Sequence, residues 1–210
     1  MLLIHSLPLP RLAAVAFALV IMAPAAGLAQ DTPPVRVRGE ITGVDGDRLT
    51  VTARDGSTVR VRLAPEHRVT AVLPADLASV QPGTFVGTAA VPQPDGRLRA
   101  LELVIFPEAM RGAGEGHYPW DLVPESTMTN ATVAATVSEA KGEVLTLTYP
   151  DGEQTIVVPP EAPIVTLAPG DDGLLRPGSH IFIGRANAQP DGTLSAGSVA
   201  VGKDGLVPPM

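Results

Sequence analysis

An internal repeat constrains the fold of this chain more than any other feature. Gln93–Gly96 (QPDG) recurs as Gln189–Gly192, and Asp55–Gly56 recurs as Asp151–Gly152, both at a displacement of 96 residues. Matches at one spacing indicate a single duplicated supersecondary unit. We therefore expect two similar structural copies, over residues 35–105 and 131–205.

The pattern inside each copy predicts β-structure. Residues of the first copy alternate between apolar and polar from Val35 to Ile41, which is typical of a half-buried strand. Leu49–Leu63 reads as a hairpin that turns at Asp55–Gly56. Pro74–Val80 has the start signal of one or two helical turns, and strands over 84–91 and 98–105 follow it.

Three strands, a small helix and two more strands form the order of a five-stranded OB barrel. The predicted fold class is therefore all-β, with two tandem OB-like barrels. An aromatic and glycine-rich insert, residues 106–130, joins them, and residues 206–210 form a C-terminal tail.

The N-terminal 29 residues have the form of a secretory signal. Arg11 precedes an apolar run over Leu12–Met22, and small residues lead to a cleavage site after Ala29, which leaves a short tail over 30–34. A retained membrane anchor is the alternative, but the run is shorter than the roughly 20 residues that span a bilayer. The chain contains no cysteine, hence neither a disulfide nor a lipid-attachment site. We expect a periplasmic protein.

Composition argues against a nucleic-acid partner. The formal net charge is −7 and aromatic residues make up 3% of the chain, so both the basic field and the stacking platforms of such proteins are missing.

The insert holds Trp120, the only tryptophan. Its large side chains suggest a segment that packs on the barrels, covering the seam between them. The alternative is a ligand pocket at the junction. The candidate ligand-binding residues are Arg111, His117, Tyr118, Trp120 and Asp121.

The histidines of the insert and of the two copies suggest two other kinds of chemistry. His117 with Glu115 and Asp121 offers nitrogen and oxygen ligands, so a metal-handling accessory protein is an alternative function. No nucleophile elbow accompanies His67 or His180, and we predict no catalytic residue and no cofactor. An unrecognised hydrolase is a third reading.

Four arginines form a second candidate site. Arg36 and Arg38 alternate on the outward face of one predicted strand, and Arg60 and Arg62 do so on another. The two pairs would form one stripe that grips a phosphate or carboxylate surface by bidentate hydrogen bonds. The alternative is edge protection and solubility.

Several segments carry a resemblance to an exported bacterial family of uncharacterised function. They are Gly83–Gly96, Phe106–Gly112, Pro119–Leu122, Met128–Val133 and Asp204–Met210. The resemblance implies tandem small β-barrels in the periplasm and supplies no catalytic residue. Some similar proteins are labelled "metal ABC transporter permease", which conflicts with the lack of several membrane-spanning segments here. The predicted function is a non-enzymatic periplasmic module that binds a small ligand or an envelope protein.

Overall fold

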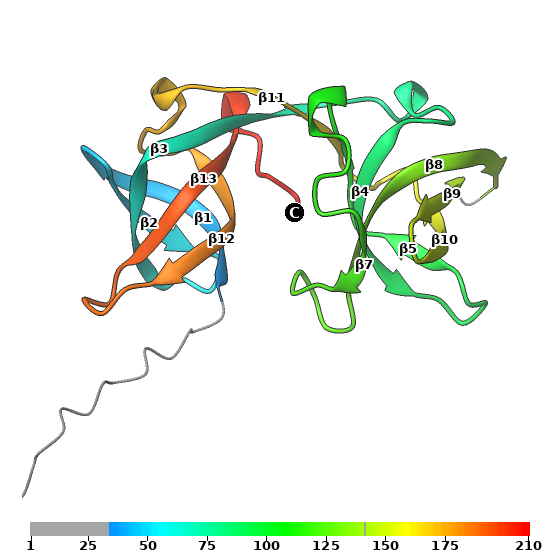
Figure 1. Cartoon of the computed structure of the whole chain (residues 1–210), viewed down its shortest axis with the longest axis horizontal. Coiled ribbons are helices and arrows are strands. Elements are labelled where there is room, and N and C mark those ends of the chain that lie inside the picture. The colour runs from blue at the N-terminus through cyan, green and yellow to red at the C-terminus, as the bar shows by residue number, and fades with distance from the viewer. Residues whose placement is uncertain (1–33, 141) are drawn as a thin grey trace, which may run out of the picture. The chain divides into compact units, whose positions relative to one another are not determined.

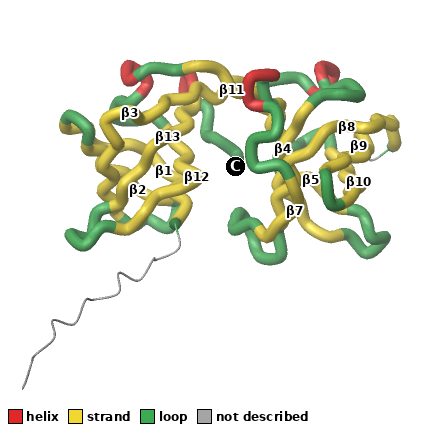
Figure 2. The backbone as a smooth tube through the Cα atoms, in the orientation of Figure 1, coloured by secondary structure: helices red, strands yellow, loops and turns green. Residues whose placement is uncertain are grey.

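The computed structural model describes residues 34–140 and 142–210, whose main secondary structure is β-strand (Figure 1). Helical structure in this part is confined to short 3₁₀ turns, drawn red in Figure 2. The predicted signal peptide, residues 1–29, and most of the tail over 30–34 lie outside the described residues. The all-β class is confirmed.

The strands that precede the insert are β1 (Val35–Asp45), β2 (Arg48–Ala53), β3 (Thr58–Pro74), β4 (Phe85–Pro92), β5 (Leu98–Ala100) and β6 (Leu103–Ile105). Those that follow are β7 (Gly116–Pro119), β8 (Thr127–Glu139), β9 (Gly142–Tyr149), β10 (Gly152–Val158), β11 (Ile164–Pro169), β12 (His180–Ala188) and β13 (Leu194–Gly202). The 3₁₀ helices are η1 (Leu77–Ser79), η2 (Glu108–Met110), η3 (Asp172–Leu174) and η4 (Lys203–Gly205).

Five strands close the first barrel. β1, β2 and β3 pair as an antiparallel meander, β13 pairs with β3 in parallel, and β12 joins β13 to β1. Alternate side chains of these strands point inward, as period-two patterning requires. The core they form consists of Val37, Ile41, Leu49, Val51, Val61, Leu63, Val69, Ile181, Ile183, Ala186, Ala196, Val199 and Val201.

A second ring of pairings closes another barrel in the same way. β8, β9 and β10 form its meander, β5 pairs with β10 in parallel, and β4 joins β5 to β8. Its core contains Val86, Ala90, Leu98, Leu103, Ala131, Val133, Leu145, Leu147, Ile156 and Val158. The parallel pairing occupies the equivalent place in both barrels, which agrees with a duplicated unit.

The copies do not close separately, so the tandem arrangement predicted from the sequence is not confirmed. The first copy, residues 35–105, contributes β1–β3 to the first barrel but β4 and β5 to the second. The second copy, residues 131–205, contributes β8–β10 to the second barrel but β12 and β13 to the first. Pairings through β11 and β6 link the thirteen strands of the described residues into one continuous sheet.

The physical reason lies in the length of β3. Its first part pairs with β2, and its last residues, Thr70–Pro74, pair with β11 instead of turning back. The register shift near Pro65, a residue suited to a bulge, bends the strand without ending it. The chain thus leaves the first barrel before β4 begins.

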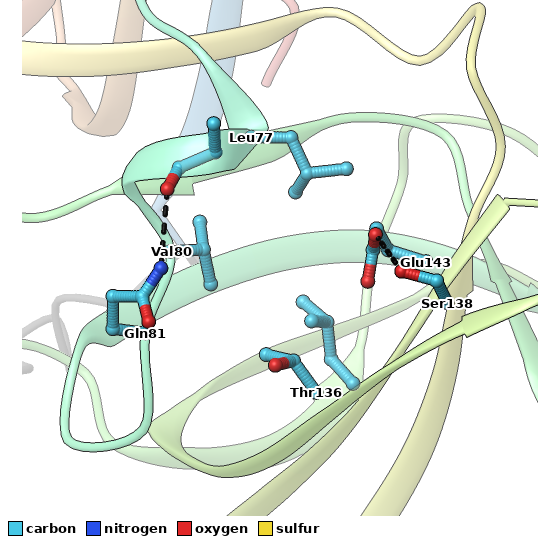
Figure 3. A pocket seen from close by; sticks show the side chains of 8 residues that line it. Leu77, Val80, Gln81, Thr136, Ser138 and Glu143 are labelled. Carbon is cyan, nitrogen blue, oxygen red and sulfur yellow. Dashed lines mark hydrogen bonds between the residues drawn. The ribbon is translucent and has the colours of Figure 1, made fainter.

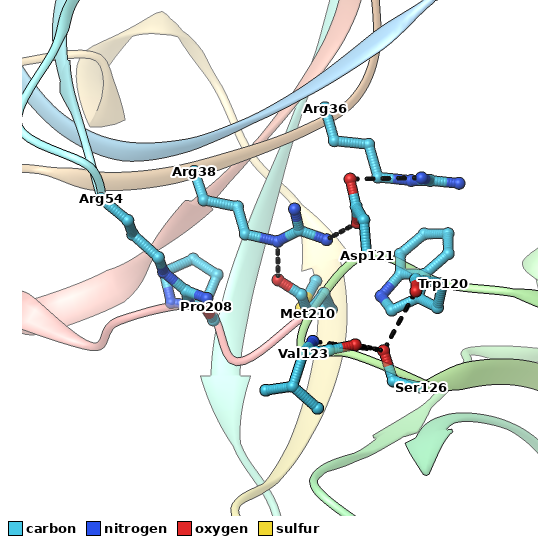
Figure 4. Close-up of polar contacts among 9 residues, drawn as sticks. All are labelled: Arg36, Arg38, Arg54, Trp120, Asp121, Val123, Ser126, Pro208 and Met210. Carbon is cyan, nitrogen blue, oxygen red and sulfur yellow. Dashed lines mark hydrogen bonds and ion pairs between the residues drawn. The ribbon is translucent and has the colours of Figure 1, made fainter. Parts of the chain in front are cut away.

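A third core lies at this crossing. It brings together Val72, Val104, Val165, Leu167 and Met210. The C-terminal tail, residues 206–210, therefore belongs to the folded structure. Arg38 Nε donates to the Met210 main-chain oxygen at 2.6 Å, and Arg54 Nη2 donates to the Pro208 oxygen at 3.1 Å (Figure 4).

Two predicted boundaries also change. β8 begins at Thr127, inside the predicted insert of residues 106–130, because Thr127–Asn130 pair with both β4 and β7. The strand predicted over 98–105 is broken at Leu101 and Glu102 into β5 and β6.

The helical turn predicted in Pro74–Val80 is present as η1, capped by the Asp76 carboxylate, which accepts from Ala78 N–H.

A cysteine pair across β1 and β12 tests the strand exchange. Glu40 and His180 are cross-strand partners, so their Cα atoms lie at about the separation that a disulfide requires. In this cysteine-free chain we expect Glu40→Cys/His180→Cys to form an intramolecular disulfide, measured as a 2 Da mass loss that reductant reverses. The control, Glu40→Cys/Thr84→Cys, places the second cysteine directly before β4, and its efficient oxidation would instead support the tandem arrangement.

Candidate functional site

The insert is held on the second barrel by Asn130. Asn130 Nδ2 donates to the Ala113 carbonyl at 3.1 Å and to the Tyr118 hydroxyl at 3.3 Å. A Cβ atom at Gly87 would lie 2.5 Å from Asn130 Oδ1, and one at Gly114 would lie 3.1 Å from Nδ2. Gly114 also has a φ of 60°, which favours glycine. Gly87 of β4 and Gly114 of the insert thus allow both backbones to approach the Asn130 amide closely.

A tight loop presents Trp120 and Asp121. The Ser126 hydroxyl donates toward the carbonyls of Trp120 and Val123 and accepts from the Val123 N–H (Figure 4). The main-chain N–H of Trp120 donates to the Ser126 carbonyl. Ser126 is buried. This one side chain satisfies several main-chain groups of the loop.

Trp120 and Asp121 contact the two arginines of β1. Asp121 Oδ1 accepts from Arg38 Nη2 at 2.7 Å, and Asp121 Oδ2 lies 3.4 Å from Arg36 Nη1 (Figure 4). The guanidinium carbon of Arg36 lies 3.7 Å from the centre of the Trp120 ring, within cation–π range. Phe182 also packs near Trp120 and Arg38. We call Arg36, Arg38, Trp120, Asp121 and Phe182 the arginine–tryptophan cluster.

The cluster balances charge locally. Burial by itself would raise the pKa of Asp121, but the Arg38 hydrogen bond and the Arg38 and Arg36 charges outweigh it and lower the pKa. The carboxylate therefore stays ionised between the two guanidinium groups. Both arginines and Asp121 are occupied in holding the insert against the first barrel, and the predicted seam-covering role is the one that these contacts favour.

The other predicted ligand-binding residues lie apart from this cluster or at its margin. Arg111 donates to Glu108 and to the Gly83 carbonyl. His117 Nδ1 lies 2.8 Å from the Thr129 hydroxyl, its ring stacks on Tyr149, and burial lowers its pKa. Tyr118 contacts the edge of Trp120, and burial raises the pKa of its hydroxyl despite the Arg36 charge. The contacts do not gather the five residues around one cavity.

The metal hypothesis gains no support from these positions. His117 contacts Thr129 and Tyr149, whereas Asp121 contacts Arg36 and Arg38. Within residues 34–140 and 142–210, no three His, Cys, Asp or Glu side chains come together at metal-binding distance.

A groove on the first barrel contains the other pair of predicted arginines. It has a volume of about 530 Å³ and is lined by Gly43, Val44, Asp45, Arg48, Leu49, Thr50, Arg60, Val61, Arg62, Asp191 and Thr193. We call it the arginine groove. Arg60 and Arg62 lie here with Arg48, while Arg36 and Arg38 contact the insert, so the four predicted arginines do not form one stripe.

Arg48 was missed by sequence reasoning because only the strand register brings it to the site. It is the direct cross-strand partner of Arg62, and Thr50 is the partner of Arg60. Arg48 follows the Asp45–Gly46–Asp47 turn. It alternates with the apolar residues of β2, and this alternation is the only indication in the sequence that its side chain points outward.

A smaller hollow of about 290 Å³ lies beside η1 in the second barrel (Figure 3). Leu77, Val80, Thr136 and Leu145 contribute to its lining. The polar groups at its rim are used internally, since Ser138 Oγ donates to Glu143 Oε1 at 2.6 Å. This hollow offers no cationic group, and it is a weaker candidate than the arginine groove.

Glu102 is a buried carboxyl group in the second barrel. Its residue is 0% exposed, Oε1 accepts from the Ala89 N–H at 2.7 Å, and Oε2 has no partner among the described residues. Burial raises the pKa of Glu102 to about 8, because the Ala89 hydrogen bond offsets only part of the desolvation. Glu102 lies in the break between β5 and β6, and its side chain accepts a hydrogen bond from the main chain of β4.

Comparison with known proteins gives no match, since no family model fits this chain and no curated protein or solved structure is significantly similar to it. In the part of the chain that the structure describes, none of the helices has the length and apolar character needed to cross a membrane.

The cluster predicts a modest effect of Asp121→Asn on stability. The substitution keeps the shape but removes both ion pairs, and because Asp121 is half exposed we expect a loss of about 1 kcal/mol. Urea unfolding followed by the emission of Trp120, the only tryptophan, measures it. Glu125→Gln in the same loop should leave the midpoint unchanged, and equal midpoints for both variants would remove the ion pairs as a source of docking energy.

Glu102 predicts a pH-dependent stability. Its folded pKa of about 8 lies above the ordinary value of 4.5, so the stability associated with the neutral carboxyl is complete below about pH 4.5 and is lost as the pH rises through 8. The slope approaches about 1.4 kcal/mol per pH unit. Denaturant unfolding from pH 5 to 9 should show this decline in the native chain and a flatter curve in Glu102→Gln. Glu153→Gln, on an exposed residue of β10, should retain the native slope; equal slopes in all three would refute the assignment.

Proposed function

We propose that this chain is a non-enzymatic binding module of the bacterial periplasm, built from a duplicated OB-like unit whose strands are exchanged between two barrels. The OB-like assignment is supported by the order of three strands, a helical turn and two strands in each copy, and by five-stranded closure. Export is supported by the signal-like segment over residues 1–29, and the mass of the exported protein tests cleavage after Ala29.

The arginine groove is the observation that carries this proposal. Its volume of about 530 Å³ falls in the range typical of small-molecule sites. It combines cationic side chains with the apolar walls of Val44 and Val61. Two of its arginines, Arg48 and Arg60, form no ion pair with any residue that the structure describes.

The arginine–tryptophan cluster has the opposite character. Its carboxylate, guanidinium groups and aromatic rings already contact one another. A ligand there would have to displace ion pairs that hold the insert. Binding at the groove displaces no such contact, so the groove is the site we favour.

Amide chemical shifts of the ¹⁵N-labelled mature protein test the proposal. We expect a panel of anions, comprising phosphate, pyrophosphate, glucuronate and citrate, to shift the resonances of Thr50, Val61 and Thr193, while neutral glucose does not. Arg60→Gln/Arg62→Gln should abolish the shifts, because the variant removes two of the cationic groups that face the ligand. Shifts confined to the insert, or none at all, would contradict a binding role for the groove.

A further inference from the structure

We propose that the arginine groove is a phosphate-binding site, with Arg48, Arg60 and Arg62 as the groups that hold the phosphate; this rests on the proposed binding function. The ligand class is a phosphate ester or diphosphate, carried by a free molecule or by a lipid headgroup. The two sources share the same phosphate group, and binding to vesicles separates a lipid headgroup from a free molecule.

The strand register gathers three guanidinium groups on one outer face. Arg48 and Arg62 are directly opposite across β2 and β3, where Cβ atoms lie about 5 Å apart. Arg60 is two residues from Arg62 on the same face, about 7 Å along the strand. Like charges directly opposite one another destabilise a sheet. Three arginines lie together here despite the repulsion between their charges. A bound anion would offset this repulsion, so the groove suits an anionic ligand.

The acids near the groove offset part of this charge, but only one of them forms an ion pair with a groove arginine. Asp47 lies 3.9 Å from Arg62, a loose pair between exposed side chains. The Asp191 carboxylate accepts from the N–H and hydroxyl of Thr193, which lower its pKa, and the charge of the nearby Arg62 lowers the pKa further. Asp45 lines the groove as the direct cross-strand partner of Arg48, although the two side chains form no ion pair.

Phosphate fits this arrangement better than carboxylate. A carboxylate has two oxygens and one charge, so a single bidentate arginine satisfies it. A phosphate monoester has three acceptor oxygens and close to two charges at neutral pH. These charges match Arg48 and Arg60, the two groove arginines that form no ion pair with any described residue. Arg62 and the Thr50 hydroxyl provide further donors at the same face.

Gly43 keeps the groove open. A Cβ atom there would contact Thr50 Cβ at 3.6 Å and Thr50 Oγ1 at 3.7 Å, which are ordinary van der Waals distances, and its φ is not in the left-handed region. The backbone therefore accepts a larger residue, whose side chain would extend over Thr50 into the groove. Gly43→Leu blocks the site while leaving every charge in place.

The experiment measures affinity of the mature protein for phosphate, pyrophosphate and glucuronate by chemical-shift titration. We expect pyrophosphate to bind at the groove most tightly and glucuronate at least tenfold more weakly. Arg48→Gln/Arg60→Gln should weaken pyrophosphate binding tenfold or more, and Gly43→Leu should abolish it. Two control variants should bind as the native protein does. Arg185→Gln removes a charge at an exposed position of β12, and Gly197→Leu adds a side chain in β13 where a Cβ atom would meet no other atom within 4 Å.

Vesicles of phosphatidylcholine with and without phosphatidic acid, whose headgroup is a phosphate monoester, separate the two sources of phosphate. Binding to the anionic vesicles that Gly43→Leu abolishes assigns a lipid headgroup; binding to free pyrophosphate alone assigns a soluble ligand. If glucuronate binds at the groove as tightly as pyrophosphate, the binding function stands and the phosphate assignment is wrong. If no anion shifts the groove resonances, both proposals fail. Native affinity in Gly43→Leu would show that the anion binds elsewhere.

Discussion

The antiparallel pairing of β3 with β11 is the contact on which the rest of the structure depends. Through it the chain leaves the first barrel toward β4 and returns from the second barrel toward β12. Each barrel needs strands from both passages to close. Closure of a small barrel removes exposed sheet edges. Loss of the outward passage would leave the second barrel without β4 and β5, and loss of the return passage would leave the first barrel without β12 and β13. The exchange therefore makes the closure of each barrel depend on strands from both copies.

The crossing also explains why the insert and tail are folded. β3, β6 and β11 present apolar side chains, including Val72, Val104 and Val165, outside the two barrel cores. Met210 from the tail and the partly buried Phe106 from the insert pack on this third core. The arginine–tryptophan cluster adds ion pairs and ring contacts between the insert and β1.

The repeat and the period-two patterns predicted a large part of the fold. They placed the strands and the helical turn, and they put Arg36, Arg38, Arg60 and Arg62 on outward faces. They did not show that the first pair meets Asp121, nor that Arg48 lies opposite Arg62. Alternation defines the face of a strand, but the strand's neighbour and register decide which side chains meet there.

Glu102 shows a signal that was present but easily passed over. Glu102 is two residues beyond Ala100 and four beyond Leu98, so period-two alternation places its side chain on the same inward face as theirs. An acid at such a position implies either a partner or a shifted pKa. The structure supplies one hydrogen bond, from Ala89, and leaves the second oxygen without a partner among the described residues.

The sequence by itself determined the β-class, the turns and the side of each strand, because these follow from the alternation and backbone preferences of neighbouring residues. Only the tertiary structure decided which copy closes which barrel. Equivalent strands of the two copies carry similar patterns, so either pairing buries the same kind of side chain. The choice depends on where the chain runs between strands, and therefore on the long path of β3 past β11.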